Sequence, residues 1–340
     1  MKRFILITAL TIATFIFILS SCNRQELYHN MYGLTQGTTY SIVYQSKLST
    51  PTDKIDREIE IMLLEIDSSL SNYNKSSLIS AINMNQDVIT DDMFREVFQL
   101  SGKIYGMTDG LFDITVGPLV KAWGFGPDAV RNFDTTRVDS LLEFVGFDKI
   151  RLVNDRVIKD DDRIWIDVNA IAQGYSVDLI CRLLDEKNIP TYLVEIGGEV
   201  RAKGRRGDRP WRVGLDRPVD NNNSPGEDLF AVVELENLSL ATSGNYRKFY
   251  IDDAGIKYSH TINPITGAPV RNTLLSATIT APDCATADAF ATACMVAGLN
   301  GAKEMITRFE FLEGYLIYSD ETGEYRFWVS EKMKSLIKEE

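Results

Sequence analysis

Two segments of the chain have apolar residues at intervals of three and four. In residues 53–70 and 92–105 these side chains fall on one stripe of a 3.6-residue repeat, which predicts amphipathic helices. Residues 284–298 (CATADAFATACMVAG) are small and apolar on nearly every side, which predicts a helix buried in the core. Shorter helices are expected over residues 139–147 and 301–308, and a charged helix is expected to end the chain.

Other segments are rich in β-branched and aromatic residues, which predicts strands. A hairpin is expected over residues 149–168, and its second strand is expected to run directly into Asp167 and then into a helix with Gly174 in its first turns. The pair Gly197–Gly198 breaks a further strand, at a point where the backbone could approach another group closely. The remaining predicted strands are residues 32–44, 191–204, 229–240, 315–319 and 325–330.

Asp288 interrupts the apolar helix, and Thr292 follows one turn later on the same face. Because an unpartnered buried carboxylate costs several kcal/mol, Asp288 requires a cation, hydrogen-bond donors or a proton. Two interpretations are open at this point. Asp288 is either a core carboxylate bonded to neighbouring backbone, or half of a hard-metal site whose oxygen ligands suit Mg²⁺ or Ca²⁺.

The first residues have the pattern of a bacterial lipoprotein signal. Two basic residues precede an apolar run over residues 4–19, and the sequence LSSC ends at Cys22. An uncleaved membrane anchor is the alternative, but the run is short for a transmembrane helix of roughly 20 residues. We expect a signal peptide over 1–21, a lipid on Cys22 and a tether over 22–31, so that the protein faces an extracytoplasmic compartment. The folded domain is expected over residues 32–335.

Composition narrows the class of protein. A chain of 340 residues with 44% hydrophobic content can bury a substantial core. Its net charge of −12 argues against nucleic acid as a partner, because phosphate backbones are bound through basic surfaces. Cys181, Cys284 and Cys294 lie in apolar helical segments and are expected to be buried free thiols. The spacing of a zinc site is absent, since there is no CxxC motif and the histidines are His29 and His260.

Three loop residues or segments are of types that bind ligands. Tyr73, in a polar Ser/Asn loop, is either a surface packing residue or a plate on which a flat ring stacks. The glycine-punctuated segment 109–127 cannot form a simple helix or strand, and such loops often line a site. Asp167 either caps the helix that follows it or lies beside a ligand at the N-terminus of that helix.

Two later segments also carry candidate chemistry. Thr242, Ser243 and Gly244 are expected to form a hydroxyl-rich turn, which either binds phosphate or is an ordinary Ser-Gly turn. His260 precedes an Asn-Pro and a Thr-Gly pair, and it is either structural or a proton carrier. The chain has no internal repeat, P-loop, GxGxxG or GxSxG motif, which removes the common nucleotide and hydrolase motifs.

Six of these segments form an ordered series along the chain. They are SNYNKSSLISAIN, GLFDITVGPLVKAWGFG, IDVNAIAQGYSVD, ATSGNYRKFY, HTINPITGAPV and ATADAFATA. In this order they resemble the successive motifs of the ApbE family, the FAD:protein FMN transferases. The resemblance implies an α+β fold, a single domain of mixed sheets with packed helices, and a periplasmic lipoprotein. It also implies Mg²⁺-dependent cleavage of FAD, attachment of FMN through its phosphate to a Thr or Ser hydroxyl of an acceptor flavoprotein subunit, and release of AMP.

The resemblance further implies ligands for the metal and the flavin. By position, Mg²⁺ would be held by Asp288, Thr292 and the backbone carbonyl of Ala170, so that Asp288 takes part in catalysis. His260 lies in the motif that the family places beside the diphosphate, and it is a candidate for the base that accepts the proton of the attacking hydroxyl. The residues expected to contact FAD are Gln36, Tyr73, Leu111, Phe112, Asp113, Asp167, Gln173, Ser243 and Ile262.

The chain departs from the family pattern at two positions. Family members often have Met where Gln36 stands and Lys where Gln173 stands. Without that Lys the site has one positive charge fewer for an anionic substrate. This keeps a second activity open, an Mg²⁺-dependent FAD pyrophosphatase in which water replaces the acceptor hydroxyl. A flavin-binding lipoprotein without turnover is the third hypothesis.

Overall fold

The computed structural model describes residues 27–126, 134–217, 228–245, 249–251 and 257–338. The expected signal peptide over 1–21, the expected lipidation site Cys22 and the loop 221–226 lie outside the described residues. Within the described ranges, no helix combines the length and the apolar character that crossing a bilayer requires.

An eight-stranded sheet forms the centre of the fold, and each of its neighbouring pairs of strands is antiparallel. Its strand order is β1-β2-β5-β6-β9-β12-β13-β14. An antiparallel sheet with helices packed on it is the expected α+β class. The strands are β1 (Leu27–Thr35), β2 (Thr38–Ser46), β5 (Tyr192–Ile196), β6 (Glu199–Lys203), β9 (Leu238–Gly244), β12 (Leu274–Ala281), β13 (Glu313–Ser319) and β14 (Tyr325–Val329).

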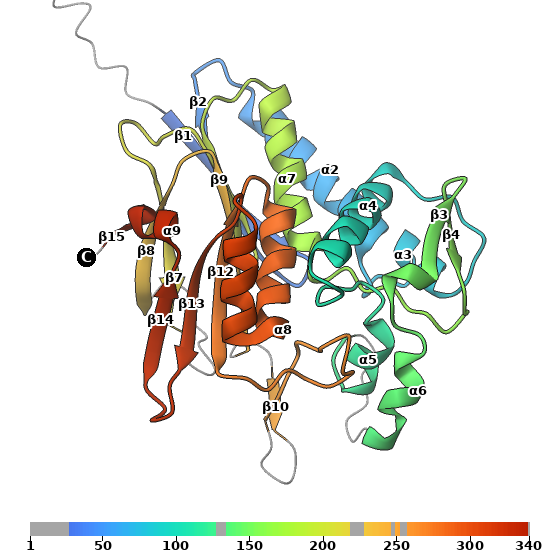
Figure 1. Cartoon of the computed structure of the whole chain (residues 1–340). Coiled ribbons are helices and arrows are strands. Elements are labelled where there is room, and N and C mark those ends of the chain that lie inside the picture. Colours follow the sequence, from blue (N-terminus) through green and yellow to red (C-terminus); the bar gives the residue numbers. More distant parts are fainter. Residues whose placement is uncertain (1–26, 127–133, 218–227, 246–248, 252–256, 339–340) are drawn as a thin grey trace, which may run out of the picture.

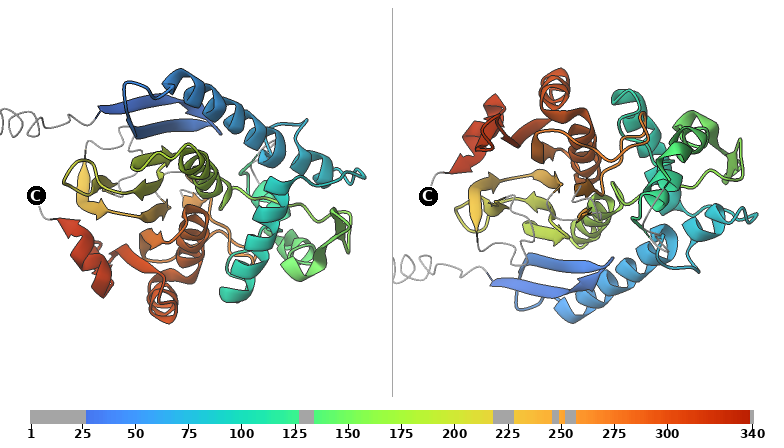
Figure 2. Two further views of the ribbon diagram at one scale, coloured as in Figure 1. Left: turned by 90° about the horizontal axis from the view of Figure 1, so that it is seen from above. Right: turned by 90° about the horizontal axis from the view of Figure 1, so that it is seen from below.

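Three long helices cover one face of this sheet (Figure 1). They are α2 (Thr52–Leu70), α7 (Ala172–Glu186) and α8 (Cys284–Arg308). Helix α7 contacts β5 and β6, α8 contacts β9 and β12, and the two helices contact each other. Helix α2 packs against α7 and lies beside the β1–β2 hairpin at one edge of the molecule (Figure 2). As expected, Cys181, Cys284 and Cys294 are buried free thiols in these helices.

A second, three-stranded sheet packs on the opposite face. Alternate residues of a strand point to opposite faces, and β5 shows this: Val194 packs among α2 and α7, whereas Leu193 packs toward Trp211 and Val233 of the small sheet. The large sheet is therefore covered on both faces. The elements of this layer are β7 (Trp211–Asp216), β8 (Leu229–Leu235), α9 (Glu331–Leu336) and β15 (Ile337–Lys338).

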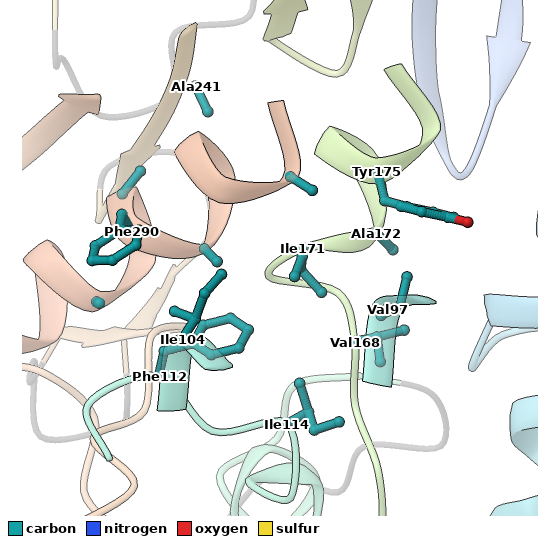
Figure 3. Close-up of a cluster of buried hydrophobic side chains, with 14 of the residues drawn as sticks. Val97, Ile104, Phe112, Ile114, Val168, Ile171, Ala172, Tyr175, Ala241 and Phe290 are labelled. Atoms are coloured by element: carbon teal, nitrogen blue, oxygen red, sulfur yellow. The ribbon is translucent and has the colours of Figure 1, made fainter. Parts of the chain in front are cut away.

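The smaller helices and the β3–β4 hairpin lie to one side of the sheet, and β10 lies below β12 (Figure 1). The largest apolar cluster joins them to α8, and Figure 3 shows Val97 and Ile104 of α4 in this cluster together with Phe112 and Phe290. One continuous core therefore links these helices to the sheet. The elements are α3 (Leu78–Asn83), α4 (Asp92–Met107), α5 (Gly117–Ala122), η1 (Thr135–Arg137), α6 (Val138–Leu142), η2 (Phe147–Lys149), β3 (Ile150–Val153), β4 (Arg156–Lys159), β10 (Phe249–Ile251) and β11 (Lys257–Ser259).

The expected single strand over 32–44 is wrong, because the chain forms the β1–β2 hairpin here. Gln36 and Gly37 have φ values of 50° and 73°. Two consecutive left-handed residues make the tight turn that matches the twist of paired strands. Strand β1 already begins at Leu27, so the expected tether over 22–31 overlaps the first strand.

The β3–β4 hairpin is confirmed, but its second strand does not run on to Asp167. It ends at Lys159. The side chain of Asp161 then accepts a hydrogen bond from the Arg163 N–H at 2.8 Å, which turns the chain away from the strand direction. The Asp167 N–H donates instead to the carbonyl of Ile114 at 2.6 Å, beside the glycine-rich segment.

Left-handed residues also divide two other predicted strands. Residues 229–240 split at Asn237, which has a φ of 54°, into β8 and β9, and these belong to different sheets. The Gly197–Gly198 pair is the turn that joins β5 to β6. Residues 242–244 are not a turn, because they are the last residues of β9, paired with β12.

The two helices predicted over 284–298 and 301–308 are confirmed as the two parts of α8. They meet at a kink at Gly298, whose φ of 70° and ψ of −178° are not helical. The helix expected over 139–147 is shorter than predicted, because α6 ends at Leu142 and Gly146 has a φ of 138°. A residue with side chain would be strained at either glycine.

Candidate functional site

A cavity of about 1230 Å³ lies where the sheet, α7, α8 and the smaller helices meet. Its walls contain every residue that the sequence assigned to the metal, the flavin or catalysis. These residues are Gln36, Tyr73, Leu111, Phe112, Asp113, Asp167, Ala170, Gln173, Ser243, His260, Ile262, Asp288 and Thr292. The fold therefore brings together segments that are far apart in the chain.

Asp288 lies in the second turn of α8 and is only 6% exposed. Its Oδ2 accepts a hydrogen bond from the Gly174 N–H in the first turn of α7 at 3.1 Å. Burial raises the pKa of Asp288 to about 7, because the charged carboxylate loses solvation that this one N–H only partly replaces. One turn later, Thr292 Oγ1 lies 3.2 Å from Ser243 Oγ of β9. The carboxylate and two hydroxyls thus face one part of the cavity.

The chemistry of these donors fits a hard cation. The described residues contain no group of three or more His, Cys, Asp or Glu side chains that could hold a metal. A metal here would instead have an all-oxygen set from the Asp288 carboxylate, the Thr292 hydroxyl and the carbonyl of Ala170, which all line the cavity. Oxygen ligands of this kind suit Mg²⁺. Asp288 can keep its backbone hydrogen bond and also bind a metal, because the Gly174 N–H occupies only one of its two carboxylate oxygens.

The segment of Leu111, Phe112 and Asp113 is held from inside the fold. Phe112 is 2% exposed and packs in the core (Figure 3). Asp113 Oδ1 accepts hydrogen bonds from the N–H and hydroxyl of Thr115, both at 2.7 Å, and Oδ2 accepts one from the Phe147 N–H at 3.1 Å. Burial raises the pKa of Asp113 to about 6 despite these donors. Phe112 and Asp113 have structural roles in this loop, and their contact with a flavin stays a prediction.

Tyr73 is 62% exposed at the edge of the cavity. The loop around it is fixed, because the Asn74 side-chain amide donates to Asp67 Oδ2 at 2.8 Å and the Ser77 hydroxyl donates to the Ser71 carbonyl at 2.7 Å. An exposed ring on a fixed loop favours the stacking interpretation over the packing one.

Three polar candidates, Gln36 of the β1–β2 turn and Asp167 and Gln173 near the start of α7, differ in their contacts. Gln36 Nε2 donates to the Ser176 hydroxyl of α7 at 2.6 Å. Gln173 lies over the β5–β6 turn, where a Cβ at Gly197 would come within 2.6 Å of its Nε2. Asp167 Oδ1 accepts from the Asn169 N–H at 2.9 Å. Asp167 does not cap α7, which begins without a side-chain cap.

His260 and Ile262 lie on a loop that packs against α5. The indole N–H of Trp123 donates to the carbonyl of Gly267 at 2.7 Å, and Ile262 is buried beside Trp123. The half-buried His260 has its ring centre 6.4 Å from that of Phe125 and lines the cavity. This loop therefore presents the imidazole from a fixed backbone.

The sequence did not indicate the wall on the far side of the cavity. Glu195 and Glu199, on either side of the Gly197–Gly198 turn, line it, and Glu195 Oε1 accepts from the Gly198 N–H at 2.8 Å. Residues 213–216 of β7 line it too. In the sequence, the Gly197–Gly198 pair was the signal that the backbone approaches another group closely at this turn. The residues of β7 carry no motif that would have indicated their place in the cavity wall.

The chain is similar to known proteins over most of its length. Residues 36–316 match the model of the ApbE family. A curated FAD:protein FMN transferase of Haemophilus influenzae is 33% identical over 319 residues, covering 90% of each chain. Another, from Escherichia coli (strain K12), is 32% identical over 315 residues, covering 90% of this chain and 88% of its own.

Solved structures agree with the sequence relatives. The flavin transferase ApbE from Vibrio cholerae has a TM-score of 0.81 and 30% identity, covering 92% of this chain and 99% of its own. The apo form of the flavinyl transferase ApbE of Pseudomonas stutzeri also has a TM-score of 0.81, at 28% identity, with 92% and 98% covered. The cavity that gathers the six motifs, the sequence relatives and the fold give one result: the chain belongs to the ApbE family.

Proposed function

We infer that this chain is an FAD:protein FMN transferase, which cleaves FAD and attaches FMN to an acceptor flavoprotein. The observation that carries this is the convergence of all the candidate site residues on one cavity. Relatives that bear this name cover most of the chain. The cavity of about 1230 Å³ exceeds the roughly 300–1,000 Å³ of a typical small-molecule site. It has room for a dinucleotide and for the side chain of an acceptor.

We propose that the site uses Mg²⁺, held by Asp288, Thr292 and the carbonyl of Ala170. Bound there, the ion would neutralise negative charge on the diphosphate of FAD. The chain's own residues supply positioning. Tyr73 offers a face for the isoalloxazine ring, and the Ser243 hydroxyl, 3.2 Å from that of Thr292, is a donor for phosphate oxygens.

His260 is the proposed carrier of the proton that the acceptor Thr or Ser hydroxyl loses as it attacks the FMN phosphorus. A neutral imidazole can take that proton near neutral pH. The bond that breaks joins this phosphorus to the bridging oxygen, which leaves with AMP. The loop clamped by Trp123 holds the imidazole in place for this step.

FAD pyrophosphatase is the second candidate, and Gln173 favours it. A neutral amide over the β5–β6 turn replaces the positive charge that the family often has there. The expectation is that FAD is still cleaved, while water competes with the acceptor hydroxyl for the FMN phosphate.

One reaction separates the two activities. The protein is incubated with FAD, Mg²⁺ and an acceptor subunit, then run on a denaturing gel. Covalent flavin fluorescence on the acceptor supports transfer, whereas free FMN with AMP supports the pyrophosphatase. Unchanged FAD would contradict both.

We propose that the protein works as a lipoprotein on the extracytoplasmic face of a bacterial membrane. The basic start, the apolar run and the LSSC sequence ending at Cys22 support this. Cys22→Ser should remove the lipid mass from the N-terminal peptide and leave the apolar run uncleaved, because the residue that carries the lipid also marks the cleavage site. A variant that keeps a lipid elsewhere would contradict the assignment.

A further inference from the structure

The first turns of α7 and α8 touch each other. A Cβ built on Gly174 would lie 2.4 Å from the carbonyl oxygen of Cys284, so only glycine allows this approach. At the same point, the Gly174 N–H donates to Asp288 of α8. The start of α7 is therefore bound by a carboxylate from α8.

The reverse contact is made by Asp178 of α7. Its Oδ1 accepts from the Cys284 N–H at 3.0 Å and its Oδ2 from the Ala285 N–H at 2.9 Å, so it binds the first two residues of α8. Asp178 follows Gly174 by one turn, just as Asp288 follows Cys284. Each helix N-terminus thus receives a carboxylate from the other helix, which the positive end of a helix favours.

The two carboxylates differ in their charge partners. Asp178, 3% exposed, forms an ion pair with Arg201 of β6. Asp288 is joined to no Lys, Arg or His in the described part of the chain; its hydrogen bond is to the Gly174 N–H. The first carboxylate is neutralised within the protein, while the second can take an external cation.

We propose that Asp178 and Arg201 are positioning residues for the metal site. This rests on the proposed function, in which ligands come from both helices: Ala170 precedes α7, and Asp288 and Thr292 lie on α8. Oxygen–metal distances must be kept within about 0.2 Å. Asp178 fixes the start of α8 against α7 through the two N–H groups that its oxygens accept from, and Arg201 pairs with this buried carboxylate from β6. The pair thereby sets the spacing of the three ligands.

The test is the affinity of the full chain for Mn²⁺, measured by electron paramagnetic resonance, beside the Mg²⁺ concentration that gives half-maximal activity. Asp178→Asn should raise the Mn²⁺ dissociation constant by about 10-fold or more, the usual effect of altering a residue that supports metal ligands. The half-maximal Mg²⁺ concentration should rise in parallel, and saturating Mg²⁺ should restore most of the activity.

Asp185→Asn is the matched control. Asp185 also joins α7 to β6, through Lys203 Nζ at 2.7 Å, but its side chain is 43% exposed and touches neither helix N-terminus. This variant should bind Mn²⁺ as the wild type does. Arg201→Gln leaves both N–H contacts of Asp178 in place, so it should raise the Mn²⁺ dissociation constant by a smaller factor than Asp178→Asn. If Asp178→Asn does not fold, the Mn²⁺ affinity of Arg201→Gln decides the test.

Unchanged Mn²⁺ affinity in both folded variants would overturn the inference, as would an equal shift in Asp185→Asn. Asp288→Ala distinguishes this from failure of the metal assignment itself. If Asp288→Ala abolishes Mn²⁺ binding while Asp178→Asn and Arg201→Gln leave it intact, the metal ligands are correct and only the positioning role of Asp178 and Arg201 is wrong. If Asp288→Ala also binds Mn²⁺ normally, the metal ligands themselves are wrong, and the inference fails with them.

Discussion

Asp288 combines the two roles that the sequence left as alternatives. Through Oδ2 it is a core carboxylate bonded to backbone at Gly174. Its other oxygen makes no hydrogen bond to the described residues and belongs to a side chain that lines the cavity beside Thr292. A buried acid with one oxygen engaged is fixed in orientation and still able to bind a cation.

Asp288→Ala should therefore lower transfer by at least about 100-fold, the effect of removing one preorganised charge-stabilising group. Its effect on the free energy of unfolding should stay below about 3 kcal/mol, because the buried Gly174 N–H loses its acceptor while the cost of burying the carboxylate is removed. Flavin fluorescence on the acceptor measures the first effect and urea unfolding the second. Activity that keeps its Mg²⁺ dependence would contradict the metal assignment.

Asp113 predicts a pH dependence of stability. Burial raises its pKa to about 6 in the folded state, whereas the unfolded carboxyl titrates near its ordinary value of about 3.9. The folded state therefore holds the proton more tightly. The resulting stabilisation is complete below about pH 4 and is lost as the pH rises through about 6.

Asp113→Asn removes this titration. Between pH 4 and 7, the wild type should lose up to about 3 kcal/mol of unfolding free energy relative to the variant. Urea unfolding of both proteins at several pH values measures the difference. A constant difference across this range would show that Asp113 has the same pKa in both states.

At the scale of elements, the break in α8 has a defined residue requirement. Gly298 has φ 70° and ψ −178°, a conformation that costs other residues about 1–3 kcal/mol. The Asn272 side-chain amide donates to the Met295 carbonyl at 3.0 Å just before this break. A Cβ on Gly298 would lie 3.2 Å from the same amide.

Gly298→Ala should thus lower the unfolding free energy by about 1–3 kcal/mol, while the metal affinity, set at the other end of α8, stays within twofold. Gly106→Ala is the control, because Gly106 lies inside α4 and a Cβ there meets nothing within 4 Å. That variant should be neutral or stabilising by up to about 1 kcal/mol. Equal destabilisation of both would remove the backbone explanation.

Element prediction succeeded where a signal extends over many residues. The helix predicted over 92–105 is α4, Asp92–Met107, because its apolar stripe repeats over four turns. It failed where one or two residues reverse the chain. Gln36 and Asn237 adopt positive φ without being glycine, and Asp161 turns the chain by one side-chain hydrogen bond. Such turns depend on what the flanking strands pair with, which a single sequence does not show.

At the scale of the molecule, the members of the site could be predicted but their partners could not. The motifs supplied most of the candidate site residues, and the structure places these residues in the cavity walls. They did not show that Gln36 would bond to Ser176, or that Asp178 would bind the start of α8. These contacts join residues more than 100 positions apart and depend on the order of strands in the sheet. The far wall of the cavity is formed by β7 because the second sheet packs there, and no sequence motif marks its residues.

Because the cavity walls belong to both sheets and to the smaller helices, FAD should stabilise the whole domain as one unit. Without Mg²⁺, FAD at 100 times its dissociation constant should raise the unfolding free energy by about 2.7 kcal/mol. Fluorescence and circular dichroism should report one coincident urea transition, shifted together. Two transitions, of which only one moves, would show that the ligand contacts a single layer.

With the proposed lipid on Cys22, the early start of β1 would limit where this enzyme can work. Only residues 23–26 separate Cys22 from Leu27, the first residue of the sheet. A fully extended chain gains about 3.3–3.6 Å per residue, so a lipid on Cys22 would keep Leu27 within on the order of 20 Å of the bilayer. An enzyme with so short a tether could not diffuse away from the membrane to reach its acceptor. Its acceptors would have to be proteins on or beside the same membrane surface.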